Sequence, residues 1–147
     1  MAEIEILVVN DAQDMADAYG IRRAVFCVEQ GVPEHEEIDG RDGDARHFLV
    51  RRDGLAVGTA RVRAIGGRTY KVERVAVRRP ARRAGLGRAL MLRLVEEIAR
   101  TGGDLVVLNA QLAVRDFSVG LGFFPEGDVF EEAGIPHIKM YRKLGRT

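Results

Sequence analysis

The sequence contains one cysteine, no tryptophan and no long run of apolar residues. A single cysteine, Cys27, excludes an internal disulfide and a metal site built from several cysteines, and we expect it to be a small buried apolar side chain. No segment approaches the roughly 18 apolar residues that a membrane-spanning helix needs. The first ten residues carry Glu3 and Glu5, whereas a secretory signal begins with basic residues. We therefore expect a cytoplasmic protein that has no metal site and no membrane partner.

The length and composition indicate one globular domain over residues 1–147. The chain has a formal net charge of +1, and 46% of its residues are hydrophobic. A domain of this size buries roughly two thirds of the surface that its unfolded chain exposes, which is enough for a real core. No repeat, low-complexity tract or linker interrupts the sequence. Collagen-like, disordered and tandem-domain architectures are therefore excluded.

The near-zero net charge hides an uneven distribution along the chain. Residues 1–50 contain four Lys or Arg and twelve Asp or Glu, and residues 51–100 contain fourteen and four. Residues 101–147 are nearly balanced, with five and six. This asymmetry predicts an anionic partner for the middle third and a cationic partner for the first third.

Apolar periodicity and turn residues predict a mixed α/β fold in which one sheet is covered by helices. Asp53-Gly54 and Gly66-Gly67 separate β-rich runs and favour type I′ hairpins, because both central residues of that turn need positive φ. The acidic, Gly-rich run from Gly31 to Ala45 has no period and predicts a functional loop. Predicted helices cover residues 86–100, residues 112–121 and a segment capped by Asp11 that ends near residue 29. Predicted strands cover residues 4–9, 47–52, 55–65, 69–77, 105–108, 123–130 and 138–144.

The segment VRRPARRAGLG at Val77–Gly87 lies between a predicted strand and a predicted helix. The first N–H groups of a helix lack intrahelical partners, so Gly85 and Gly87 there would let a phosphate approach the backbone closely. Guanidinium groups suit bidentate phosphate contacts. The alternative is a Gly-containing turn followed by a solvated basic helix, and the pattern alone leaves both open. The arginines of this segment and the helix start are Arg78, Arg79, Arg82, Arg83 and Arg88.

Arg82-x-x-Gly85-x-Gly87, placed after a strand and before an amphipathic helix, resembles the pyrophosphate-binding motif Q/R-x-x-G-x-G/A of the GNAT acetyltransferases. The Rossmann and P-loop motifs are both absent. NAQLAVRDFSVGLGFF, at 109–124, is similar to the second block of that superfamily. RRAVFCVEQ at 22–30, EEIDGRDGDARHFL at 36–49 and EEAGIPHIKM at 131–140 resemble its ElaA-like branch.

The resemblance implies the GNAT fold, with a largely antiparallel sheet whose central strands, 69–77 and 105–108, are splayed and flanked by helices. It implies acetyl-CoA as acyl donor and a small-molecule or peptide amine as acceptor, and many GNAT proteins form homodimers. The cofactor-binding residues that we expect lie at the strand end, in the phosphate loop and in the second block. They are Val75, Ala76, Val77, Arg82, Arg83, Ala84, Gly85, Leu86, Gly87, Arg88, Asn109, Gln111 and Phe117.

Acetyl transfer to an amine needs a base for the ammonium and a proton for the departing thiolate. Glu73, on the strand face of Val75 and Val77, is one candidate base, and a histidine such as His137 suits proton transfer near neutral pH. The alternatives are a surface carboxylate paired with Lys71 or Arg74, and a structural histidine. Where many GNAT enzymes have an acidic tyrosine this chain has Ser118, which we expect only to hydrogen-bond the sulfur. Tyr70 and Tyr141 are the other candidate acids.

The acidic first third of the chain offers an acceptor site, because carboxylates attract a cationic amine. A solvated acidic loop is the alternative reading, and His47 also fits a structural role. Ser118 in place of tyrosine also leaves open a non-catalytic acyl-CoA sensor, and the N-terminal pattern loosely resembles acyl-homoserine-lactone synthases. A nucleic-acid partner is disfavoured, because the acidic third would repel phosphate and no zinc-finger or RNP motif occurs. The expected acceptor residues are Glu29, Gln30, Asp39 and His47, with Asp42 and Asp44 beside them.

Overall fold

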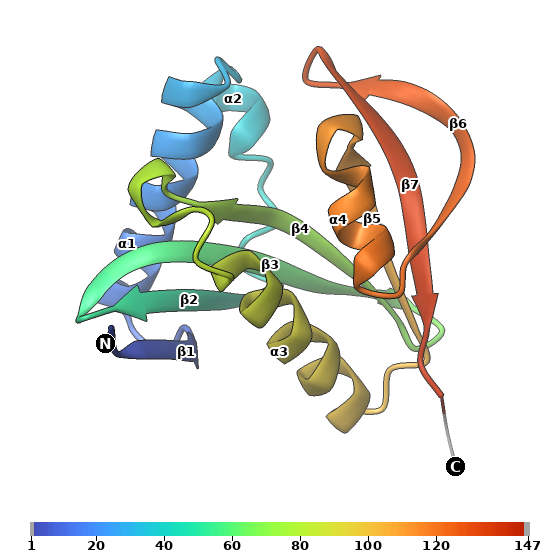
Figure 1. Cartoon of the computed structure of the whole chain (residues 1–147), viewed down its shortest axis with the longest axis horizontal. Coiled ribbons are helices and arrows are strands. Elements are labelled where there is room, and N and C mark those ends of the chain that lie inside the picture. The colour runs from blue at the N-terminus through green and yellow to red at the C-terminus, as the bar shows by residue number, and fades with distance from the viewer. Residues whose placement is uncertain (1, 146–147) are drawn as a thin grey trace.

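The computed structural model describes residues 2–145 and has one seven-stranded sheet in the order β1-β2-β3-β4-β5-β7-β6. Every neighbouring pair is antiparallel except β4 and β5. The mixed sheet with its helices confirms the predicted fold class (Figure 1). The strands are β1 (Ile4–Val8), β2 (Arg46–Arg52), β3 (Leu55–Gly66), β4 (Thr69–Val77), β5 (Leu105–Gln111), β6 (Phe124–Glu132) and β7 (Ile135–Lys143).

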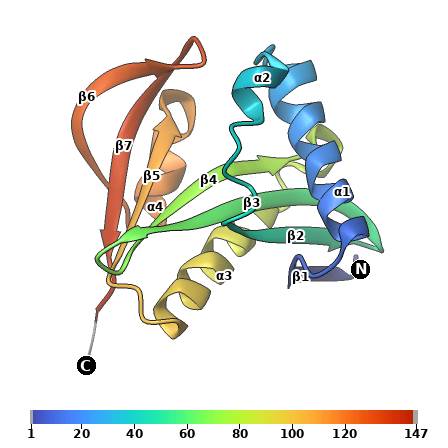
Figure 2. The ribbon, with the colours of Figure 1, turned by 180° about the vertical axis from the view of Figure 1, so that it is seen from behind.

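Helices cover both faces of the sheet. On one face α3 (Leu86–Arg100) packs Leu90, Leu94 and Ile98 into the main core, and it has the bounds predicted from its apolar stripe. On the other face α1 (Ala12–Arg22) covers the N-terminal strands and buries Ala18 and Ile21 (Figure 2). The N-terminal half of the sheet is therefore enclosed by α1 and α3. No helix of residues 2–145 is long and apolar enough to cross a membrane.

The hairpin turns set the register of the meander. Asp53 and Gly54 have φ of 49° and 83° and join Arg52 to Leu55, which confirms the predicted turn. The prediction of the second turn is wrong by one residue. Its central residues are Gly67 and Arg68 (φ 61° and 64°), and Gly66 pairs with Thr69. In the resulting register Arg63 lies opposite Lys71.

The two central strands diverge, as the resemblance implies. β4 and β5 pair from Thr69 and Leu105 to Val72 and Leu108, and the pairing ends there. Beyond it β4 has a bulge at Arg74, which has a φ of 56° and lies where the register with β3 shifts. A bulge bends a strand and increases its twist. The two halves of the sheet consequently form a V that is visible in Figure 2.

Four further predictions need correction. The first helix continues beyond α1 as a π-helix, η1 (Arg23–Glu29), and the loop predicted over residues 31–45 contains a short helix, α2 (Glu34–Glu37). The predicted strand 105–108 continues to Gln111, because its last residues alternate between the core and the open side. The predicted helix 112–121 divides into a 3-10 turn, η3 (Leu112–Val114), and α4 (Arg115–Gly120). A 3-10 turn, η2 (Arg79–Ala81), precedes α3.

Candidate functional site

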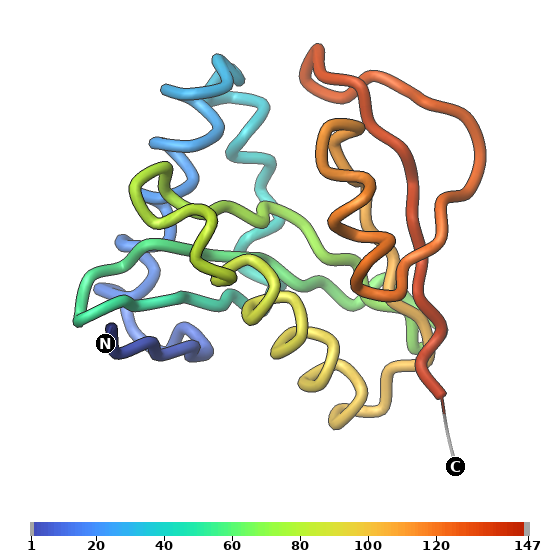
Figure 3. The backbone as a smooth tube through the Cα atoms, in the orientation of Figure 1, coloured from blue at the N-terminus to red at the C-terminus, as the bar shows by residue number. Residues whose placement is uncertain are grey.

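A cleft of about 1190 Å³ occupies the divergence between β4 and β5. Its walls come from η1, α2, the end of β4, the start of α3, the end of β5, α4 and the β6–β7 hairpin. In Figure 3 the α2 segment and the β6–β7 hairpin rise on the two sides of the V. Typical small-molecule sites have about 300–1,000 Å³, so the cleft is large enough for two substrates. Of the predicted cofactor-binding, catalytic and acceptor residues, all line this cleft except Ala84, His47, Asp42 and Asp44.

The end of β4 presents backbone N–H groups to the cleft. The N–H of Arg78 donates to Val57 O on β3 at 2.8 Å. Successive N–H groups of a strand point in opposite directions. Those of Val75 and Val77 therefore point away from β3, toward the gap, where β5 no longer pairs with β4. Such fixed donors can polarise a carbonyl oxygen without reorganisation.

The N-terminus of α3 opens into the same cleft. Gly85 precedes the helix in the left-handed conformation (φ 76°), and the first helical bond runs from Ala89 N–H to Gly85 O at 3.0 Å. The N–H groups of Leu86, Gly87 and Arg88 precede that bond and have no acceptor within the helix. This 15-residue helix carries partial positive charge at this end, which suits a phosphate group.

Arg82 already has a carboxylate partner. Its Nη1 and Nη2 contact the two carboxylate oxygens of Glu29 at 2.6 and 2.7 Å, and its Nε donates to Val77 O at 2.8 Å. The hydrogen bond from Arg82 lowers the pKa of Glu29 below its usual value. Glu29 thus lines the cleft as an ion-pair partner of the phosphate loop. Within residues 2–145, Arg83 and Arg88 line the cleft without an ion pair to a carboxylate.

His137 lines the cleft from the start of β7 and is buried. Its Nδ1 donates to Ile135 O at 2.7 Å, so in the neutral ring Nε2 carries the lone pair. Nε2 is 3.6 Å from Oε2 of Glu132, which would stabilise a protonated ring. Gln111, its register partner on β5, donates to Gln30 Oε1 at 3.0 Å across the cleft. These contacts leave His137 with an acceptor nitrogen in a cleft.

Glu73 lies on the floor of the cleft among three cations. It accepts hydrogen bonds from Arg63 and from Arg61, the latter at 3.0 Å, and Lys71 Nζ lies 4.0 Å away. Burial alone would raise the pKa of Glu73, but the hydrogen bond from Arg63 and the charge of Arg61 lower it below its usual value. A carboxylate held in this way is a weak proton acceptor.

A network of ion pairs explains the uneven charge of the sequence. Arg61, which has no exposed surface, contacts Asp39 at 2.8 Å and Asp42 at 3.0 Å, and Arg22 contacts Asp42 at 2.7 Å. Acidic groups of the first third are therefore paired with arginines, of which Arg51, Arg61, Arg74 and Arg82 come from the basic middle third. The prediction that carboxylates here attract a cationic acceptor loses its basis. The members of this arginine–carboxylate network are Arg22, Arg61, Arg63, Lys71, Arg74, Glu37, Asp39, Asp42 and Glu73.

His47 lies outside the cleft, beneath the loop that follows α2. Its Nε2 donates to Asp42 O at 2.9 Å, and burial lowers the pKa of its imidazole. The strained bulge residue Arg74 is similarly tied to this segment, since its Nη2 donates to Glu37 O at 2.9 Å. Both contacts hold the segment against the sheet and shape the wall of the cleft.

The chain's three tyrosines do not line the cleft. Tyr70 lies at the far end of the sheet, and Tyr141 packs on Phe124 with ring centroids 5.9 Å apart. Ser118, buried on α4, does line it, as does Phe117, whose Cζ would lie 3.6 Å from a Cβ on Gly87. Neither Tyr70 nor Tyr141 therefore replaces the tyrosine acid missing at Ser118.

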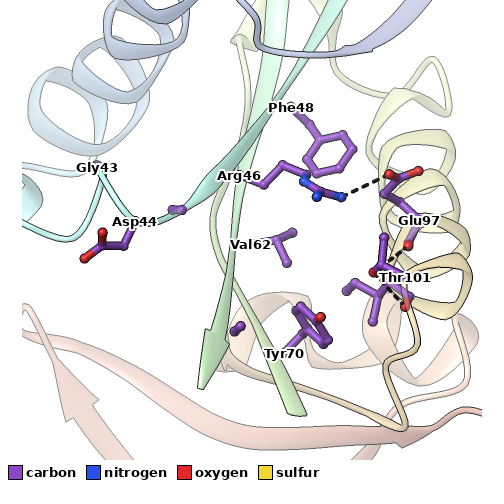
Figure 4. Close-up of a pocket in the computed structure, with 11 residues that line it drawn as sticks. Gly43, Asp44, Arg46, Phe48, Val62, Tyr70, Glu97 and Thr101 are labelled. Carbon is purple, nitrogen blue, oxygen red and sulfur yellow. Dashed lines mark hydrogen bonds and ion pairs between the residues drawn. The ribbon is translucent and has the colours of Figure 1, made fainter. Parts of the chain in front are cut away.

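A smaller cavity of about 400 Å³ contains Tyr70 (Figure 4). It lies between the β2–β4 strands and the last turns of α3, and Figure 4 shows Arg46 reaching across it to Glu97. The hydrogen bonds from Arg100 and Arg93 lower the pKa of Glu97 to about 2, although burial acts in the opposite direction. Arg46 and Thr101 both hydrogen-bond Glu97 in this cavity.

The splayed sheet, the open helix N-terminus and the long cleft between them define a GNAT-type acyltransferase fold. The family described as "Acetyltransferase (GNAT) domain" matches residues 12–144, and the chain belongs to this family. The protein ElaA of Escherichia coli K12 is 36% identical over 129 residues, which are 84% of each chain, and this supports the ElaA-like branch.

Solved structures agree with this assignment. The crystal structure of Escherichia coli ElaA has a TM-score of 0.85 and 33% identity, and covers 97% of this chain and 100% of that chain. An acyl-CoA N-acyltransferase from Pseudomonas aeruginosa has a TM-score of 0.86 and 30% identity over 95% of this chain and 99% of its own. A GNAT acetyltransferase from Elizabethkingia anophelis with acetyl-CoA bound shares the fold, with a TM-score of 0.76 and 13% identity over 96% of this chain and 98% of its own. The protein is therefore an acyltransferase by family.

Several residues of the cleft were not predicted from the sequence. Arg63, Lys71 and Glu132 line it. Arg63 and Lys71 belong to no recognised motif, and Glu132 lies in the 131–140 block but was given no role there. The signal for the first two is their cross-strand pairing, which needs the correct hairpin register. Glu132 precedes the Ala133-Gly134 turn, where φ values of 52° and 74° bring it near His137.

Proposed function

We propose that the protein is an N-acetyltransferase that transfers an acetyl group from acetyl-CoA to a primary amine of a small molecule or peptide. The observation that carries the proposal is the cleft that begins where β4 and β5 stop pairing, and that is lined by both an open helix N-terminus and the buried His137. We further propose that residues 1–147 act as one cytoplasmic domain, with a homodimer as the expected assembly.

The residues of the cleft fit acetyl-CoA as donor. The N–H groups at the start of α3, with Arg83 and Arg88, would bind the pyrophosphate, and Gly85 keeps the approach open. Arg82 would also bind the pyrophosphate if its ion pair with Glu29 were broken. The N–H groups of Val75 and Val77 would polarise the acetyl carbonyl. Asn109, Gln111 and Phe117 would line the pantetheine path between β5 and α4.

We assign the proton acceptor to His137 and retain Glu73 as the anchor of Arg63 and Lys71. Nε2 of His137 would accept the proton of the incoming ammonium, and Glu132 would stabilise the charged ring. Acetyl-CoA supplies a thioester-bound acetyl group: a C–N bond forms, the C–S bond breaks, and the products are an amide, the CoA thiol and a proton. Ser118 or water would hydrogen-bond the sulfur.

Acetyl-CoA binding and turnover test the proposal together. The protein should be titrated in a calorimeter with acetyl-CoA, CoA and a short DNA duplex. Only the CoA compounds should bind, with micromolar dissociation constants and a binding free energy of roughly −8 kcal/mol. An amine panel should then release CoA thiol. Binding without turnover would favour an acyl-CoA sensor, and turnover only with homoserine-lactone precursors would favour a synthase. Absence of acetyl-CoA binding would refute the reading of the phosphate loop.

Gly85→Val should weaken acetyl-CoA binding by about tenfold or more, because a branched residue at this φ adds strain of about 1–3 kcal/mol and extends into the phosphate approach. Gly54→Val is the matched control: Gly54 has φ 83° and an equally open Cβ position, but it lies in a distant hairpin. Both variants should lose stability, and only Gly85→Val should lose affinity in calorimetry. Equal affinities in the two variants would contradict the phosphate-loop assignment.

Ser118→Ala should lower kcat by only about tenfold or less, the effect of one neutral hydrogen bond of about 0.5–1.5 kcal/mol. A serine hydroxyl is a far weaker acid than a phenol, so Ser118 should orient the sulfur and not protonate it. Single-turnover rates of CoA release would measure this. A loss of about a thousandfold with unchanged acetyl-CoA affinity would instead make Ser118 the proton donor.

A further inference from the structure

The arginine–carboxylate network carries an excess positive charge. It contains five cationic side chains and four carboxylates, so its net charge is +1. His47 also touches it, but burial lowers the pKa of that imidazole and keeps it neutral at pH 7. The carboxylates of the acidic loop therefore do not fully neutralise the cationic side chains, and the floor of the cleft keeps a positive charge.

The surplus charge lies on the side of the network that faces the cleft. Both carboxylate oxygens of Glu73 already accept from arginines, one from Arg63 and one from Arg61. Lys71 Nζ is 4.0 Å from Glu73 and forms no hydrogen bond to any of residues 2–145. Lys71 and Arg63 are 25% and 16% exposed and both line the cleft. An ammonium with three free donors next to a guanidinium is a site for an anionic group.

The opposite wall of the cleft has the opposite charge. Glu132 lies there beside His137, half exposed, and the nearby Asn109 amide is 3.5 Å from its carboxylate. At the mouth, the exposed Glu36 and Arg41 both line the cleft and cancel each other in charge. The acceptor end is thus dipolar, with a positive floor on β3–β4 and a negative wall on the β6–β7 hairpin.

We propose that the acceptor is an amine that also bears a carboxylate, which Lys71 and Arg63 bind while the amine faces Glu132 and His137. This inference rests on the proposed function, because it assigns the acceptor of that reaction. Lys71 pairs with Val107 and His137 with Gln111, which are four residues apart on β5, or roughly 13 Å. Side chains from both ends shorten this span, so the amine and the carboxylate of the acceptor are several bonds apart.

Matched acceptors test the charge preference directly. We would compare β-alanine, 4-aminobutyrate and 6-aminohexanoate with the carboxamide of each, at saturating acetyl-CoA. The unaltered protein should show a kcat/KM at least about tenfold higher for the acids, the effect of one charge-assisted contact. Lys71→Met should reduce this ratio to about threefold or less, through KM, while its acetyl-CoA affinity stays the same. Lys143→Met, at the far end of β7, is the lysine control and should leave the ratio unchanged.

Two outcomes would overturn the inference without affecting the proposed function: equal turnover of acids and carboxamides, or a ratio that Lys71→Met leaves unchanged. If acetyl-CoA binds but no amine is acetylated, the anion site can be tested without turnover. In that case 4-aminobutyrate and its carboxamide are each titrated into the CoA complex in a calorimeter. Binding of the acid but not of its carboxamide, lost in Lys71→Met, would support the anion site. Equal or absent binding of the two would refute it. Failure to bind acetyl-CoA would refute the proposed function first.

Discussion

His137→Gln should lower kcat by about 10²–10⁴-fold, the usual contribution of a positioned general base. The substitution removes the only imidazole that is buried in the described cleft, and Gln has no basic nitrogen to accept a proton at neutral pH. Acetyl-CoA affinity should not change, because the contacts of His137 are with Ile135, Glu132 and Phe130 and not with the phosphate loop. Steady-state kinetics with one acceptor, together with calorimetry of acetyl-CoA, would measure both.

Chemical rescue separates a base from a structural histidine. His137→Gly creates space for free imidazole, which should restore part of the rate in proportion to its concentration. Glu132→Gln provides a graded comparison, since it removes the charge 3.6 Å from Nε2 and should cost less than loss of the ring. Rescue should fail if His137 only supports the turn through Ile135. In that event thermal unfolding should show a loss of stability large enough to explain the loss of rate.

The local parts of the site could be predicted from the sequence. Gly85 and Gly87 ahead of the apolar stripe of α3 define a helix start, and the structure has that helix from Leu86 to Arg100. Short-range rules suffice here, because capping, glycine conformation and apolar periodicity all act within one or two turns of chain. The same rules located the Asp53-Gly54 hairpin.

The floor of the cleft could not be predicted, because it depends on register and on long-range pairing. A one-residue error at Gly66-Gly67 moves every later side chain of the strand to the other face, and Arg63 would then not lie opposite Lys71. Arg22, within the predicted first helix, is also buried and contacts Glu37 and Asp42. Sequence periodicity does not distinguish a buried ion pair from an apolar contact.

The same lesson applies to charge. Opposite excesses in the first and middle thirds suggested two external partners, whereas much of that charge is paired within the fold. A count of charges along the chain cannot say which are neutralised. The informative quantity is the charge in a cleft that is only partly neutralised, here that of Lys71, which is 4.0 Å from a carboxylate that already accepts from two arginines.

Arg61→Met should destabilise the protein by about 3–5 kcal/mol, because it removes a fully buried guanidinium that is shared by three partly buried carboxylates. Arg61 is fully buried, and its guanidinium contacts Asp39, Asp42 and Glu73 within 3.0 Å. At this chain length the midpoint of thermal unfolding should fall by about 10 °C or more. Denaturant unfolding at pH 7 would measure the change in free energy. Arg51→Met is the control, since Arg51 pairs with Asp14 and Asp17 near the surface and should cost about 1 kcal/mol or less.

The pH dependence of this loss identifies its cause. The hydrogen bond from Arg61 lowers the pKa of Asp39, and the pKa of Asp42 is also low, because hydrogen bonds from Arg22 and Arg61 outweigh its burial. Carboxylates with a lowered pKa stabilise the fold above their unfolded value of about 4, and this contribution disappears as the pH falls below it. The difference between Arg61→Met and the unaltered protein should therefore be largest at pH 7 and shrink toward pH 3. An equal difference at both pH values would mean that Arg61 stabilises the sheet through packing, and the positive floor of the cleft would then need another origin.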